Sequence, residues 1–207
     1  MSARRLRCLA PVVAGLALAM LTAGCSLSRE APVKNTYLLD PRLPAAVAAA
    51  RPATVRIGNV NVASPYRDRA FVYRTGDLQY ESDFYHEFFI APASMIAQST
   101  VKALEASRLF ARVVPSGSAP EEGDFVLEAF VSDLYADARG KPAQAVVGVS
   151  FYLTRTTYPA SVVWSKSYVE RTPLGASTPD ALAVAWNESL GRVYAQLVRD
   201  LGELPAR

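Results

Sequence analysis

Two residue types on which catalytic and metal sites depend are nearly absent from this chain. Its 207 residues include two cysteines, Cys8 and Cys25, and one histidine, His86. Two thiols are too few for a zinc knuckle or an iron–sulfur site, and a single imidazole rules out a histidine-rich metal centre. His86 alone could still serve as the base of a catalytic triad, but a lone histidine in a tyrosine-rich stretch is more typical of a hydrogen-bonded structural residue. We therefore expect no metal site and no cofactor.

Other signatures of catalysis are lacking as well. The chain has no glycine-rich phosphate loop, so any ATP hydrolysis must belong to a partner. Gly148-Val149-Ser150 is not followed by glycine and falls inside an expected strand, so it is not a nucleophile elbow. Paired carboxylates can perform general acid–base chemistry, but we interpret the one dense group of them as the solvated face of a hairpin and its exit loop. That group comprises Asp77, Glu81, Asp83 and Glu87. We expect no catalytic residues.

The chain has no excess of positive over negative charge once its first residues are set aside. The formal net charge is +3, and all of the excess comes from Arg4, Arg5 and Arg7 in an N-terminal stretch without acids. Subtracting these three from 22 Lys+Arg leaves 19, against 19 Asp+Glu. A chain of zero net charge lacks the overall positive charge that attracts a phosphate backbone, which argues against a nucleic-acid partner.

The N-terminus has the layout of an export signal, residues 1–24. A short basic region, residues 1–7, precedes an apolar run, residues 8–23, that is shorter than the ~20 residues needed to cross a bilayer. The end of this run, Leu21-Thr22-Ala23-Gly24-Cys25, resembles the bacterial lipobox, in which cleavage between Gly24 and Cys25 leaves an acylated cysteine. It departs from the usual pattern at Thr22, where leucine is common. The alternatives are an ordinary signal peptide with an incidental cysteine, and an uncleaved membrane anchor.

The residues after Cys25 predict where the anchored protein is delivered and how it is tethered. Several acyl chains on one cysteine give stable anchoring. Ser26 in place of aspartate favours the outer membrane under the sorting rule of diderm bacterial lipoproteins. Residues 25–53 contain four prolines and one strand-like patch at residues 36–39, which predicts a lipidated tether. The folded domain is expected to span residues 54–207.

Hydrophobic periodicity in residues 54–207 predicts a single domain of the mixed α/β class in an α+β arrangement. We expect a mixed, largely antiparallel β-sheet packed by two main helices, about 91–107 and 179–202. Thr178 is a suitable N-cap for the second helix, Pro179 fits its first turn, and Trp186 lies on its apolar face. The expected strands are residues 54–62, 70–74, 78–82, 110–114, 124–136, 145–157 and 161–170.

Aromatic residues are concentrated in residues 66–89, which contain eight of the twenty in the chain. We expect Phe71, Phe88 and Phe89 to favour the core, because their neighbours are apolar. Tyrosine combines an apolar ring with a polar tip and suits interfaces. The candidates for partner or lipid contact are Tyr73, Tyr80, Phe84 and Tyr85. For Tyr80, Phe84 and Tyr85 an exposed contact surface and a core position are equally good interpretations.

Three segments together resemble a known family. Tyr73-Arg74-Thr75-Gly76-Asp77-Leu78-Gln79-Tyr80-Glu81-Ser82-Asp83-Phe84-Tyr85-His86-Glu87-Phe88 is similar to the hallmark segment of the ABC-type transport auxiliary lipoproteins, the family of paraquat-inducible protein C. Leu109-Phe110-Ala111-Arg112-Val113-Val114 and Tyr37-x-Leu39 resemble its further markers. The resemblance implies an outer-membrane lipoprotein facing the periplasm. It would work with a mammalian-cell-entry (MCE) protein, an ABC permease and an ATPase that move lipid between membranes and support envelope integrity.

Two further function classes stay open beside a non-catalytic accessory subunit. One is an envelope lipoprotein with hydrolase activity, and the other is a purely structural envelope lipoprotein. An accessory subunit at an outer-membrane dock would gain from forming a homo-oligomeric ring, because a ring binds an elongated conduit at several weak sites at once. The aromatic stretch Tyr73–Phe89 is the expected contact.

Replacing Cys25 tests the lipobox. Cys25→Ser removes the thiol that accepts the acyl chain, so we expect acylation and cleavage to be blocked. Metabolic labelling with radiolabelled palmitate plus detergent partition tests this. Cys8→Ser is the matched control and should keep the label. Label retained in Cys25→Ser would rule the lipobox out.

Overall fold

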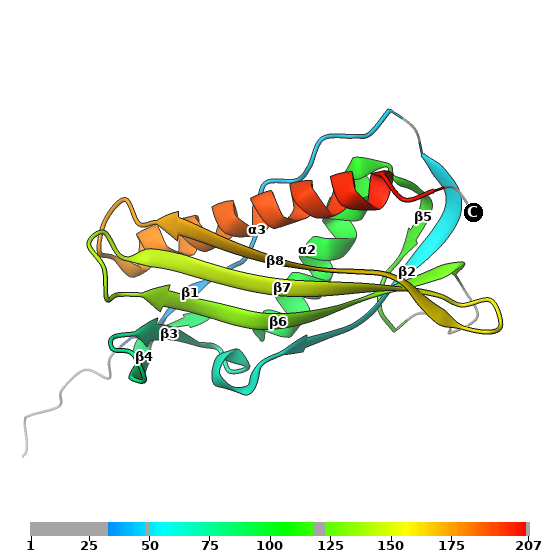
Figure 1. Ribbon diagram of the computed structural model, residues 1–207. Helices are drawn as coiled ribbons and strands as arrows, with labels where there is room; N and C mark the ends of the chain where they lie inside the picture. The colour runs from blue at the N-terminus through cyan, green and yellow to red at the C-terminus, as the bar shows by residue number, and fades with distance from the viewer. Residues whose placement is uncertain (1–32, 49, 118–122, 206–207) are drawn as a thin grey trace, which may run out of the picture. The chain divides into compact units, whose positions relative to one another are not determined.

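The protein is described from a computed structural model that covers residues 33–48, 50–117 and 123–205 (Figure 1). The chain divides into residues Met1–Val33 and a second unit, Lys34–Arg207. All elements below belong to the second unit. The strands are β1 (Asn35–Tyr37), β2 (Arg51–Val62), β3 (Ala70–Arg74), β4 (Tyr80–Phe88), β5 (Phe110–Val114), β6 (Phe125–Asp137), β7 (Gln144–Arg155) and β8 (Ser161–Pro173). The helices are η1 (Ser64–Tyr66), α2 (Pro92–Ser107) and α3 (Pro179–Gly202).

The eight strands form one mixed sheet organised around β6. One edge of β6 pairs antiparallel with the whole of β7, which pairs antiparallel with β8. The other edge of β6 is shared by two strands: β2 pairs parallel with its first half, and β3 pairs parallel with its last two residues. β5 flanks β2, while β4 and then β1 flank β3. The predicted α+β fold with a mixed sheet and two main helices is confirmed.

Both long helices pack on one face of the sheet (Figure 1). α3 lies against β7 and β8, and α2 lies against β2 and β5. Thr178 caps α3 as predicted, because its Oγ1 accepts the N–H of Ala181 at 3.2 Å. α2 begins at Pro92 and ends before Arg108, whose φ of 53° places it in the left-handed region that closes many helices.

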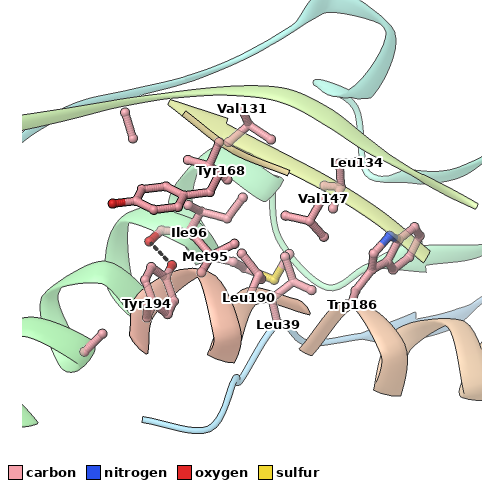
Figure 2. Packing of buried hydrophobic residues seen from close by; sticks show 14 of the residues in the cluster. Leu39, Met95, Ile96, Val131, Leu134, Val147, Tyr168, Trp186, Leu190 and Tyr194 are labelled. Atoms are coloured by element: carbon pink, nitrogen blue, oxygen red, sulfur yellow. Dashed lines mark hydrogen bonds between the residues drawn. The ribbon is translucent and has the colours of Figure 1, made fainter. Parts of the chain in front are cut away.

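The core lies between this helical layer and the sheet (Figure 2). Trp186 of α3 is fully buried, and its ring centroid lies 4.8 Å from that of Phe71 and 5.2 Å from that of Phe88. The two helices meet through a buried hydroxyl: Tyr194 Oη lies 2.7 Å from Ser99 Oγ. Burial raises the pKa of Tyr194, so this hydroxyl stays protonated.

The predicted boundary at residue 54 is wrong, because the domain begins about twenty residues earlier. β1 pairs parallel with β4, which adds a strand at the far edge of the sheet. Leu39 is buried, and the N–H of Asp40 donates to Asn187 Oδ1 of α3 at 2.6 Å. The N–H of Val47 donates to the carbonyl of Ser107 at 2.8 Å. Prolines in this stretch mark an extended segment lying across the helices, not a free tether.

The second correction concerns the segment after the first hairpin. The expected strand at 78–82 with an exit loop is instead β4, which runs to Phe88. Alternation of apolar and polar residues is lost within β4, so hydrophobic periodicity could not predict its full length.

The remaining strands lie within a few residues of their predicted bounds, and the antiparallel β6–β7–β8 meander is confirmed. β8 ends the sheet with Lys166 opposite Phe151 and Arg171 opposite Val146, and a register shift interrupts its pairing near Thr154.

Truncating the central aromatic side chain should destabilise the domain strongly. Trp186→Ala removes a buried indole that packs against two phenylalanine rings, for an expected loss of about 3–5 kcal/mol in the free energy of unfolding. Val184→Ala, on the same helix and 58% exposed, is the control and should change stability by less than about 0.5 kcal/mol. Urea denaturation followed by circular dichroism measures both. Equal stability of the two variants would contradict the described core.

Candidate functional site

The hairpin formed by β3 and β4 contains a pronounced bulge. Ala70 of β3 pairs with Glu87 of β4, and Val72 pairs with Ser82. One residue of β3, Phe71, therefore lies opposite four residues of β4, 83–86. The extra residues of β4 leave the regular pairing of the two strands and form a turn that bulges out of the strand.

The carboxylate of Asp83 holds this bulge together. Its Oδ1 accepts the backbone N–H groups of Tyr85 at 2.8 Å and of His86 at 3.0 Å. Its Oδ2 lies 2.9 Å from His86 Nδ1 and accepts the hydroxyl of Tyr73 at 3.2 Å. Partial burial opposes the charge, but the hydrogen bonds from Tyr85 and His86 outweigh it and lower the pKa of Asp83. Asp83 is therefore ionised and fixed at neutral pH.

The turn presents two aromatic side chains to solvent. Phe84 is 64% exposed and Tyr85 is 49% exposed, and their rings meet edge to face at 5.2 Å. The amine of Lys34 lies 5.4 Å from the centre of the Phe84 ring, within cation–π range. We call Lys34, Phe84 and Tyr85 the aromatic projection.

Ion pairs fasten the base of the projection to neighbouring strands. Glu87 accepts Lys34 Nζ at 3.0 Å and Arg69 at 2.6 Å. Arg69 Nε also donates to the carbonyl of Phe88 at 2.7 Å. The β1, β3 and β4 segments are thus tied together directly beneath the exposed rings.

The structure divides the four predicted contact residues into two pairs. Phe84 and Tyr85 are free at the surface, whereas Tyr73 is half-buried and bonded to Asp83. Burial raises the pKa of Tyr73, so its hydroxyl remains a donor. Tyr80 is partly exposed, but its ring packs edge-on against Tyr135 at 5.7 Å, so it also supports the fold.

Other expectations for this stretch divide in the same way. Phe71 and Phe88 are core residues as predicted, but Phe89 is 58% exposed because it follows the last residue of β4. The interpretation of the carboxylates as one solvated face is wrong for Asp83 and Glu87, which are bonded. Sequence reasoning missed the role of Asp83. Aspartate side chains often accept the backbone N–H groups of the residues two and three positions further on, which forms a turn. Asp83 was therefore a recognisable turn signal in the sequence.

The Asp83–His86 pair resembles two members of a catalytic triad, so its surroundings matter. In the described residues, no serine or threonine hydroxyl lies within hydrogen-bond distance of His86, and no group of three His, Cys, Asp or Glu side chains can hold a metal ion. Within the same residues, no helix is long and apolar enough to cross a membrane. The predicted cleavage and lipidation residues, Gly24 and Cys25, lie outside the described part of the chain.

The bond network of Asp83 predicts a dependence of stability on pH. Because the pKa of Asp83 is lower in the folded than in the unfolded chain, the unfolded state binds more protons in acid. Its contribution is therefore present above the unfolded pKa near 4 and is lost as the pH falls through the folded pKa. We expect Asp83→Asn to be less stable than the wild type at pH 7, by an amount that shrinks towards pH 3. Urea titrations at several pH values measure this difference, and a pH-independent difference would contradict it.

Comparisons with known proteins agree on the fold. The chain matches no protein-family model and no curated protein. Among solved structures it is similar to protein XCC0632 from Xanthomonas campestris, described with the family DUF330, with a TM-score of 0.70 and 19% identity over 79% of this chain and 92% of that one. An uncharacterised protein gives a TM-score of 0.64 and 14% identity over 82% and 99% of the two chains. Lipoprotein GNA1162 from Neisseria meningitidis gives 0.40 and 14% over 72% and 99%. The first two likenesses establish that this chain has the same fold as those proteins.

Proposed function

We propose that this chain is a non-enzymatic accessory lipoprotein of an MCE/ABC-type system that moves lipid between membranes. It would be anchored through Cys25 in the outer membrane, face the periplasm, and dock the periplasmic lipid conduit there. The resemblance of the Tyr73–Phe88 segment to the auxiliary lipoproteins suggests this role. It is supported by the way that segment is built, as a fixed surface projection and not as a cleft around reactive groups.

The observation that carries the docking role is an uncovered sheet face. Both long helices pack on one side of the sheet, which leaves the opposite side of β6, β7 and β8, here called the outer face, without a long helix; η1 reaches it at β6, where Tyr66 stacks on Tyr135. The strand register places Phe130, Ser150 and Ser167 in one row across this face. Tyr152 and Val169 lie in the rows on either side, and Phe130, Tyr152 and Val169 are exposed.

The chemistry of the outer face suits a protein partner. Exposed apolar side chains stand beside small hydroxyls, and Ser150 Oγ lies 2.7 Å from Ser167 Oγ. Aromatic side chains, here Phe130 and Tyr152, are enriched in interfaces that form between folded proteins. A ring of several copies would present this face repeatedly around an MCE conduit, and each weak contact would add to the others.

A charge placed on the outer face tests the docking role. Val169→Lys puts a solvated cation into the proposed interface, so we expect capture of the purified MCE protein to fall at least about tenfold, which corresponds to about 1.4 kcal/mol. The experiment is co-purification of the detergent-solubilised, acylated chain with the MCE protein, followed by affinity measurement.

The control is a valine of the same exposure on the helical side. Val184 is 58% exposed and Val169 is 57% exposed, so Val184→Lys makes the same chemical change away from the outer face. It should leave capture unchanged. If the wild type does not capture the MCE protein, the MCE role is wrong. If Val169→Lys and Val184→Lys capture it equally well, the contact does not involve the outer face.

A further inference from the structure

We propose that the aromatic projection is a membrane-contact site: Phe84 and Tyr85 insert into the headgroup region of the bilayer that carries the acyl anchor, with Lys34 at the lipid phosphates. This inference rests on acylation of Cys25 in the proposed function, and it deepens that function by assigning the projection to lipid and the outer face to protein. The occupant is a phospholipid surface.

The length of chain before the domain points to this occupant. Lys34 is the first residue of the folded unit, and it lies against the projection itself. Eight residues lie between Cys25 and Lys34, so the nine residue steps from one to the other span at most about 32 Å at 3.3–3.6 Å per residue. The anchor therefore holds the projection, which includes the first residue of the folded unit, within about 32 Å of the acylated cysteine.

The side chains of the projection have the chemistry of the bilayer interface. Tyrosine is enriched at this depth because its ring enters the apolar layer while its hydroxyl stays hydrated. Phe84 adds an apolar ring that is 64% exposed. The ammonium of Lys34 lies 5.4 Å from the centre of the Phe84 ring and pairs with Glu87 at 3.0 Å, and because the side chain is 46% exposed, lipid phosphate oxygens can also reach it.

The rigidity of the projection makes insertion effective. The bonds of Asp83 to the N–H groups of Tyr85 and His86 hold the turn in one conformation before any contact is made. Glu87 joins the base to Lys34 and Arg69. Little conformational freedom remains to be lost on insertion, and the acyl anchor supplies a high local concentration of lipid. Two rings are then enough for a contact that would be weak for an untethered protein.

Single-cysteine labelling of the full acylated protein tests the contact. Cys8 leaves with the signal peptide and Cys25 is acylated, so an introduced cysteine is the one free thiol. Tyr85→Cys and Val184→Cys place the same environment-sensitive NBD probe at positions that are 49% and 58% exposed. Each protein is reconstituted into vesicles of phosphatidylethanolamine and phosphatidylglycerol, with and without lipids carrying a nitroxide below the headgroup.

Membrane contact predicts a blue-shifted emission at position 85 and loss of most of its fluorescence in nitroxide vesicles, with neither effect at position 184. Adding Phe84→Ser to the position-85 protein should reduce the quenching, and circular dichroism checks that each variant is folded. Equal, water-like emission at both positions would overturn the proposal. So would a blue shift at position 85 that occurs only after MCE protein is added, because the occupant would then be a protein. Flotation with the vesicles separates these outcomes from failure of the anchor, since an unacylated chain would not float.

Discussion

The shared edge of β6 is the constraint on which the rest of the domain depends. A strand edge can pair with one partner at each position, and here β2 takes the first half while β3 takes the end. The chain between them must step out of the sheet through η1 and return. Everything attached to β3, namely β4 and then β1, is thereby carried to one end of the sheet. The projection lies at that end because both edges of β6 are already paired, so β4 and β1 can join the sheet only beyond β3.

Local signals in the sequence located most elements. The N-cap at Thr178 and the apolar face that contains Trp186 defined α3, and alternation defined most of the strands. The boundary of the domain was not predictable in this way. β1 has three residues, and its pairing with β4 joins positions about fifty residues apart. Leu39 is buried next to a carbonyl, that of Leu38, which accepts Asn187 Nδ2 of α3 about 150 residues away at 3.2 Å. Contacts between segments so far apart in the chain leave no signal in the hydrophobic pattern of either segment.

The candidate site was predicted as a region but not as an arrangement. Aromatic density singled out the segment, yet composition could not separate Tyr80, which packs on Tyr135, from Phe84, which is exposed. The distinction comes from the bulge, where one residue of β3 faces four of β4. That geometry follows from hydrogen bonds to Asp83, whose significance lies in the backbone groups it satisfies and not in acid–base chemistry.

The position of β8 bears on how anchored copies behave when crowded in the plane of a membrane. A terminal strand of thirteen residues offers a row of backbone groups to which another chain could add. Here Lys166 stands on one side of the strand and Arg171 on the other, and the register shift near Thr154 bends the edge. Long charged side chains and an interrupted register make this edge a poor template for pairing with a second copy. Neighbouring molecules are thereby kept from fusing their sheets into a continuous ribbon, and their association is left to side chains on the faces.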